Sequence, residues 1–168
     1  MEDKKEPYNS SSKKARELKI SDFGTPGGVR EIAKMPKTAT FFAQARSILE
    51  NIVDRPLISR SGLSATLSKK SIKEILGGES TGKSFDLKAH LKAAANLEKL
   101  YSNAIEKWQF ELNPNKNNEG LKDRRYLFAP MEYDNRIVPV KLTIKEYKNT
   151  TKGRRIYSIE TIDAEIKK

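Results

Sequence analysis

The spacing of the apolar residues changes along this chain, from a helical period in its first part to strict alternation in its last part. Apolar side chains recur every three or four positions over 41–53, as on one face of a helix. Over 138–145 they alternate with polar residues, as on a strand that has one buried face. Helices that precede antiparallel strands predict an α+β fold, in which N-terminal helices pack on a C-terminal antiparallel β-meander.

Capping and breaking residues place the helices. Thr38 can cap the first long helix, and Pro56 stops it because the residue before a proline resists the helical conformation. Ser68 is placed to cap a second, shorter helix. The elements expected in this half are a helix over 38–55, a small hairpin over 57–67, a helix over 69–76, a flexible loop at 80–84, and a helix capped by Asp86 that runs to about Tyr101.

The strands follow from alternation and from turn residues. Apolar positions alternate at 127–133 and again at 138–145, and the dipeptide Asp134-Asn135 between them is typical of a two-residue hairpin turn. Further strands are expected at 107–112, where Trp108 begins an alternating run, and at 155–161.

The chain divides by composition into three parts. Residues 1–28 are polar, charged and rich in Ser and Gly, and they have almost no periodic apolar pattern. Such a segment cannot bury enough apolar surface to offset its ordering entropy, so we expect a mobile basic arm. A helical segment at 29–56 and an α+β domain at 57–168 complete the expected organisation.

The chain carries a net charge of +11, from 33 Lys and Arg against 22 Asp and Glu, which favours a polyanionic partner, above all nucleic acid. The sequence has no cysteine, which excludes disulfides, a thiolate nucleophile and Cys-ligated metals, and its single histidine excludes a His-rich metal site. We therefore expect no metal and no cofactor. No apolar run reaches the ~20 residues of a membrane span and no secretory signal is present, so a cytoplasmic location is expected.

Residues 77–84 fit the phosphate-loop pattern G-x-x-x-x-G-K-[ST]. A phosphate loop follows a buried apolar strand, whereas the stretch 69–76 is charged and has a helical period. The strands that follow are antiparallel and supply no acidic magnesium ligand. A Gly/Ser loop between two helices is therefore the favoured interpretation, and magnesium-dependent nucleotide binding through Lys83 is the disfavoured one.

His90 is the one side chain whose ordinary pKa suits proton transfer near neutral pH. On the helix 86–101 it falls within the apolar face, together with Leu87 and Leu91, and so it faces the sheet. A general acid or base and a core histidine satisfied by a hydrogen bond are both compatible with that position.

Cationic residues cluster at several predicted elements. On the strand 138–145, Lys141, Thr143 and Lys145 share the face opposite the Val/Leu/Ile face, so they line either an exposed sheet or the floor of a phosphate-binding groove. Tyr126 can stack on a base or pack in the core. The other cations in question are Lys69, Lys70 and Lys73 on the short helix, and Arg124 and Arg125 at the start of a strand.

Five stretches carry a resemblance to a known domain by their sequence and by their order along the chain: 65–76, 89–97, 125–130, 138–145 and 157–160. The most specific are the histidine helix Ala89-His90-Leu91 and the strand Tyr126-Leu127-Phe128-Ala129-Pro130. In these stretches the chain resembles the third type of large polyvalent protein-associated domain. That domain occurs in proteins of phages and conjugative elements and is placed in the barnase–EndoU–colicin–RelE nuclease fold group.

The resemblance implies a metal-independent ribonuclease of the toxin or effector kind, in which a base activates the 2′-hydroxyl group, a cation stabilises the phosphorane and an acid protonates the leaving oxygen. We expect His90 to be the acid or base, and Lys70, with Arg125 or Lys141, to stabilise the phosphorane. The site positions that the resemblance implies are Lys70, Ser71, His90, Tyr126 and Thr143, with Ser71 and Thr143 orienting the phosphate, and RNA contacts are expected at Lys69, Arg125, Tyr126, Lys141 and Lys145.

The expected partners are RNA, with tRNA as one class, and an acidic inhibitor protein. A domain of this kind acts on its own or is delivered into a target cell as part of a larger protein. The alternative is a non-catalytic basic module of a mobile-element protein, which binds RNA or a partner protein without turnover.

Overall fold

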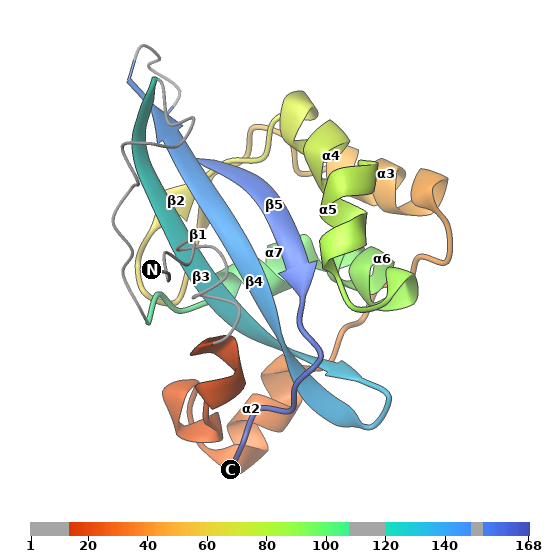
Figure 1. Ribbon diagram of the computed structural model, residues 1–168, viewed down its shortest axis with the longest axis vertical. Helices are drawn as coiled ribbons and strands as arrows, with labels where there is room; N and C mark the ends of the chain where they lie inside the picture. The colour runs from red at the N-terminus through yellow and green to blue at the C-terminus, as the bar shows by residue number, and fades with distance from the viewer. Residues whose placement is uncertain (1–13, 108–119, 149–152) are drawn as a thin grey trace, which may run out of the picture.

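The computed structural model describes residues 14–107, 120–148 and 153–168. Helices precede a three-stranded antiparallel sheet in these ranges (Figure 1), which confirms the predicted α+β fold. No helix within them has the length and apolar character of a membrane span. The elements are η1 (Ala15–Glu17), η2 (Ile20–Asp22), α2 (Pro26–Ile32), α3 (Phe42–Glu50), β1 (Leu57–Ile58), β2 (Ser64–Ala65), α4 (Lys69–Ile75), α5 (Gly78–Lys83), α6 (Leu87–Ala95), α7 (Leu97–Ser102), β3 (Leu121–Tyr133), β4 (Arg136–Tyr147) and β5 (Arg155–Thr161).

The sheet has the order β3-β4-β5, with β4 in the middle. Asp134 and Asn135 join β3 to β4, and their φ angles of 52° and 63° are those that a type I′ turn requires. The predicted hairpin turn and the strand predicted at 155–161 are thus confirmed, as is the small hairpin β1-β2. The strand predicted at 107–112 falls on 108–119, outside the described residues.

One face of the sheet packs on the helices. Leu127, Leu142 and Ile144 point to this face and are fully buried against α3, α4 and α6. Ala89 and Ala93 of α6 are also fully buried, and their small side chains let the helix approach the core closely. Burial of each large apolar side chain contributes about 1.5–3 kcal/mol, so this face dominates the stability of the domain.

The opposite face of the sheet is covered at one end by the segments nearest the chain termini. Leu18, Phe23 and Ile166 pack there against Phe128 of β3, and Ile20 N–H donates to the Lys167 carbonyl oxygen at 2.6 Å. Figure 1 shows these segments together at the lower end of the sheet. Residues 14–28 are therefore folded onto the sheet instead of forming the mobile arm that their composition predicts. The rest of that expectation concerns residues 1–13, which lie outside the described ranges.

Two predicted helix boundaries were wrong. The N-cap of α3 is Phe41 and not Thr38. The residue before it, Thr40, donates its N–H group to the Gln44 side-chain oxygen at 2.7 Å. The helix predicted over 86–101 is broken at Asn96, which separates α6 from α7. The Asn96 side chain accepts a hydrogen bond from Lys37 N–H and donates one to the Lys37 carbonyl oxygen, both at 2.9 Å, so it fixes the preceding loop at the break.

Segment 80–84 is the third difference, since it was expected to be a loop and belongs largely to α5. Its Ser80 hydroxyl group donates to the Ile159 carbonyl oxygen of β5 at 3.2 Å, so tertiary contacts hold a glycine-rich sequence in helical form. By contrast, the cap predicted at Ser68 is confirmed, because its hydroxyl oxygen accepts a hydrogen bond from Ser71 N–H at 3.0 Å.

Candidate functional site

Two adjoining pockets lie where α4 and α5 meet the sheet, and they share Glu74, Lys145 and Tyr157. Their volumes are about 350 and 210 Å³. We refer to the two pockets together as the groove. The other described residues that line it are Ser68, Lys70, Ser71, Tyr147, Gly153 and Arg155 in the larger pocket, and Glu79, Ser80, Lys83, Arg124, Tyr126, Thr143 and Ser158 in the smaller one.

Strand geometry gathers the sheet residues of the groove. Thr143 and Lys145 are two residues apart on β4, so their side chains point to the same face. The register places Tyr126 opposite Thr143 and Arg124 opposite Lys145. A hydroxyl group, an aromatic ring and two cations therefore lie together on the face that is not packed on α6.

A β-bulge adds Tyr157 to this face. Thr143 pairs with Ser158, whereas the next residue, Ile144, pairs with Ile156, so Tyr157 has no partner in the register. An extra residue of this kind turns its side chain away from the regular alternation. As a result, Tyr157 and Ser158 both line the groove although they are neighbours in sequence.

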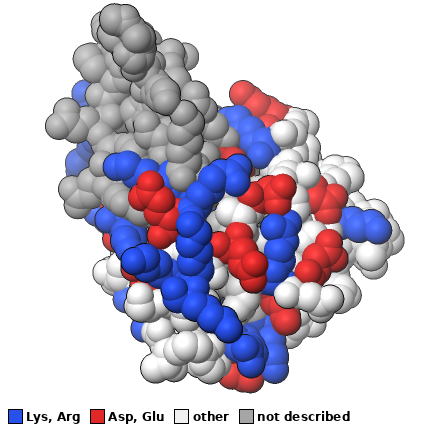
Figure 2. Space-filling model, turned by 60° about the horizontal axis from the view of Figure 1, so that its bottom comes forward, with Lys and Arg blue, Asp and Glu red and all other residues white. Residues whose placement is uncertain are grey.

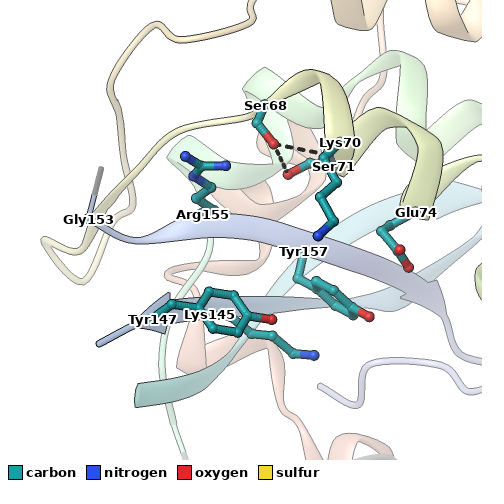
Figure 3. A pocket seen from close by; sticks show the side chains of 9 residues that line it. All are labelled: Ser68, Lys70, Ser71, Glu74, Lys145, Tyr147, Gly153, Arg155 and Tyr157. Atoms are coloured by element: carbon teal, nitrogen blue, oxygen red, sulfur yellow. Dashed lines mark hydrogen bonds between the residues drawn. The ribbon is translucent and has the colours of Figure 1, made fainter. Parts of the chain in front are cut away.

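Helix α4 supplies the wall opposite the sheet. The Ser68 cap fixes its first turn, and Lys70 and Glu74 lie one helical turn apart on the same side. Figure 3 shows the Lys70 side chain extending from α4 toward Tyr157, with Glu74 farther along the helix and beside the same ring. The groove thus has cations on both of its walls.

Lys145 lies at the junction of the two pockets. Its Nζ atom is 3.3 Å from the centroid of the Tyr157 ring, which is a cation–π contact. Burial lowers the pKa of Lys145 to about 8, with a further lowering from Arg124 that Glu74 opposes. The groove therefore contains an amine that is partly neutral near physiological pH and can accept a proton.

Lys141 lies below the groove and does not line it. Its side chain is 1% exposed and forms an ion pair with Glu160 at 3.3 Å. Its Nζ atom is 5.0 Å from the centroid of the Tyr126 ring. Burial, opposed by Glu160, lowers the pKa of Lys141 to about 8. The RNA contact expected of Lys141 stays a prediction, and in this structure its side chain is buried and lines neither pocket.

His90 is sealed in the protein interior, with 0% of its surface exposed. Its Nε2–H group donates to the Ile75 carbonyl oxygen at 2.7 Å, and its Nδ1 atom accepts from the Ser84 hydroxyl group at 2.6 Å. The Ser84 oxygen in turn accepts from Thr161 N–H at 2.9 Å. Burial lowers the pKa of His90, which keeps the ring neutral. The predicted burial is confirmed, but a sealed ring with both nitrogens bonded has no path to a substrate.

Two further cations of the predicted site also lie apart from the groove. Arg125 points to the other face of β3, where it pairs with Asp123 at 2.8 Å and Glu106 at 3.0 Å. These carboxylates raise its pKa. Lys69 is exposed on α4 and lines neither pocket. Of the predicted site residues, the groove brings together Lys70, Ser71, Tyr126, Thr143 and Lys145.

Several groove residues were not predicted from the sequence. Arg124 was named only as a strand cation, yet the alternation that groups Lys145 with Thr143 also places it opposite Lys145 once the hairpin register is counted back from Asp134. Glu74 follows from helical spacing, four residues after Lys70. Tyr157 could not be placed from the sequence, since its position depends on the bulge.

The phosphate-loop pattern at 77–84 forms no phosphate cradle. It follows helix α4 and is itself mostly the helix α5, whereas a phosphate loop follows a strand. Ser84, the residue that holds magnesium in a phosphate loop, is bonded to His90. Lys83 instead lines the groove, so the Gly/Ser segment contributes one cation to the groove.

The positive charge is not spread evenly over the surface. Figure 2 shows Lys and Arg side chains in a band across one face, with carboxylates close beside them. Several surface cations are paired, among them Arg136 with Asp163 at 2.7 Å and Arg55 with Glu98 at 3.2 Å. A polyanion therefore meets mixed charge on that face, whereas the groove combines a pocket with several cations and aromatic rings.

Comparison with known proteins gives one match. Residues 39–157, more than half of the chain, match the family model of the large polyvalent protein-associated domain 3. Neither the curated proteins nor the solved structures contain a match. The match supports the domain family that the sequence resembles, and the nuclease fold group stays a prediction.

Proposed function

The chain belongs to the large polyvalent protein-associated domain 3 family, and we propose that it binds single-stranded RNA in the groove. The observation that carries this proposal is the composition of the groove. Five cationic side chains and three tyrosines line two pockets that are joined at Lys145 and Tyr157. Proteins that bind unpaired RNA combine cations for the phosphates with aromatic rings for the bases, as this groove does.

Different groove residues are placed to contact the phosphates and the bases of an RNA strand. Lys70 on α4 and Arg155 on β5 flank the larger pocket, where they can neutralise successive phosphates. Tyr147 and Tyr157 supply aromatic surface in the larger pocket, to which an unpaired base can pack, whereas Tyr126 is 2% exposed and belongs to the core. A duplex keeps its bases stacked inside, so it cannot use these rings.

Lys70 and Lys69 provide a matched test, because they are adjacent exposed lysines of α4 and only Lys70 lines the groove. The binding of a fluorescently labelled ten-nucleotide RNA is measured by anisotropy at several salt concentrations. Lys70→Ala should weaken binding about three- to tenfold and reduce the salt slope by about one, as the loss of a phosphate contact does. Lys69→Ala should bind as the wild type does. Equal effects of the two variants, or no binding by the wild type, contradict the proposal.

Metal-independent RNA cleavage is a second candidate, and the observation that favours it is the position of Lys145 at the junction of the two pockets, where burial lowers its pKa to about 8. In this proposal neutral Lys145, not His90, removes the proton of a 2′-hydroxyl group. The 2′-oxygen attacks phosphorus, and the P–O5′ bond breaks. A 2′,3′-cyclic phosphate forms, while the leaving oxygen takes a proton from water. The cations of the groove stabilise the charge of the phosphorane.

Cleavage is tested with labelled RNA in the presence of a chelator. Lys145→Arg keeps the positive charge but removes the proton acceptor, because an arginine stays protonated. The variant should bind RNA and fail to cleave it. RNA that the wild type binds but leaves intact excludes the second candidate and retains the first.

A further inference from the structure

Glu74 is unusual in a groove proposed to hold a polyanion. It lines both pockets and is half-buried beside Lys145 and Tyr157. Burial, and after it the charge of Glu74 and a hydrogen bond to its carboxylate, raise the pKa of Tyr157, and Glu74 also opposes the lowering of the Lys145 pKa, so its charge acts inside the groove. Among the described residues, no Lys or Arg forms an ion pair with Glu74 within 4.0 Å. A carboxylate in such a place repels phosphates, and it lowers affinity unless the ligand brings hydrogen-bond donors to it.

We infer that Glu74 gives the groove a preference for RNA with an unpaired guanine, by accepting hydrogen bonds from the N1–H and N2–H groups of that base. This inference rests on the proposed RNA binding and names the base that the same site selects. Glu74 would thus be the residue that determines specificity, while the cations of the groove supply affinity.

The chemistry of the four bases supports this choice. On the Watson–Crick edge, guanine presents two adjacent donors, which match the two oxygens of a carboxylate. Adenine and cytosine present one amino donor beside a ring-nitrogen acceptor, and uracil presents one donor between two acceptors. An acceptor placed against a carboxylate is repelled, so guanine is the one base that engages both oxygens without repulsion.

The position of Glu74 fits a base and not a phosphate. Like Tyr157, it borders both pockets, so it faces the place where the two pockets join. Figure 3 shows its carboxylate beside the Tyr157 ring, at the end of the larger pocket away from Arg155. Phosphates at Lys70 and Arg155 would leave a base of the same strand to approach Glu74 along the tyrosine surface.

Glu79 offers a matched control, because it also lines the smaller pocket but lies on α5 and does not border the larger pocket. The probes are a labelled ten-nucleotide uridine RNA and the same RNA with one central guanosine, inosine, adenosine or cytidine. The wild type should bind the guanosine RNA about tenfold tighter than the all-uridine RNA, as one bidentate contact allows. Inosine lacks the N2 amino group and should bind with intermediate affinity.

Glu74→Gln should bind the all-uridine RNA at least as tightly as the wild type does, because a negative charge is removed, while the guanosine preference falls below about twofold. Retained binding of the all-uridine RNA also shows that the variant is folded. Glu79→Gln should keep the preference. A wild type that binds all five RNAs equally overturns the inference but not the proposed function. The inference is also overturned, and the proposed function is not, if Glu74→Gln raises the affinity for all five RNAs by the same factor. A wild type that binds none of them overturns both.

Discussion

The Ser84 hydroxyl group donates a hydrogen bond to Nδ1 of His90 at 2.6 Å, and this contact connects the turn before α6 to the protein interior. The Ile75 carbonyl oxygen accepts a hydrogen bond from the Nε2–H group, so the histidine is a neutral Nε2–H tautomer. Thr161 N–H completes the chain of bonds at the end of β5. The only histidine of the sequence thus joins α4, α6 and the sheet, and these hydrogen bonds are expected to stabilise the fold.

Stability should fall as the pH is lowered from 7.5 to 5.5. The pKa of His90 is lowered in the folded protein, so the unfolded chain takes up a proton first as the pH falls below the ordinary value of 6.5. The stability is complete above that value and declines below it, by at most about 1.4 kcal/mol per pH unit. Urea unfolding at several pH values measures the slope. His90→Gln should have a flatter profile over this range, and an unchanged slope in the variant contradicts this account.

Ser84→Ala should destabilise the domain by about 1–3 kcal/mol, because it leaves the Thr161 N–H group and the His90 Nδ1 atom without their partner. Thermal or urea unfolding is the measurement. Ser102→Ala is the control, since the Ser102 hydroxyl group bonds only to the Lys99 carbonyl oxygen on an exposed helix end. A loss as small as that of the control would mean that the network contributes little.

Removing one partner of the buried Lys141–Glu160 pair should be costly. Glu160→Gln removes the carboxylate that pairs with the buried Lys141 ammonium group at 3.3 Å, and the free energy of unfolding should fall by about 3–5 kcal/mol. The double variant Lys141→Met, Glu160→Gln removes both charges and should recover most of this loss. Urea unfolding of the two single variants and the double variant gives the coupling energy. Additive effects would show that the two charges are independent.

Raising the pH from 7.5 to 9.5 should stabilise the protein. The folded-state pKa values of Lys141 and Lys145 are both lowered to about 8, whereas these lysines titrate near 10.5 in the unfolded chain. Between these values the unfolded state holds more protons, so its free energy rises relative to the folded state. Melting temperatures in buffers of equal ionic strength measure the effect. A melting temperature that falls over this range contradicts the burial of both amines.

The β3-β4 turn should tolerate glycine but not alanine. Asn135 has a φ of 63°, a conformation that asparagine and glycine accept and alanine resists. Asn135→Ala should therefore destabilise the protein by about 1 kcal/mol, whereas Asn135→Gly should be close to neutral. Urea unfolding separates the two, and equal losses would mean that the turn conformation is not what stabilises the hairpin.

Much of the fold could be predicted because its signals are local. The alternation at 138–145, the Asp134-Asn135 turn and the Ser68 cap each specify a short segment, and each is confirmed. The break at Asn96 and the helix α5 depend on contacts with Lys37 and Ile159, which are distant in sequence. Local propensity contains no information on such partners.

The sequence predicts which face of a strand or helix a site residue occupies. It does not predict whether that face is open to solvent. Lys145 and Thr143 were correctly placed on one face. The helical period correctly put His90 on the inner face of its helix, but it does not say whether the inner face borders a cavity or solid core. Likewise, alternation places Lys141 on the groove face and gives no sign that Tyr126 and Glu160 close over it.

Because of the bulge, one extra residue of β5, Tyr157, decides which side chain lies next to Lys145 in the groove. If Tyr157 were deleted, Ser158 and Ile156 would keep Thr143 and Ile144 as their partners in an unbroken register, and the groove would lose the phenol ring next to Lys145. Loss of that one residue would thus reshape the binding surface while the remaining strands and helices kept their amino acids.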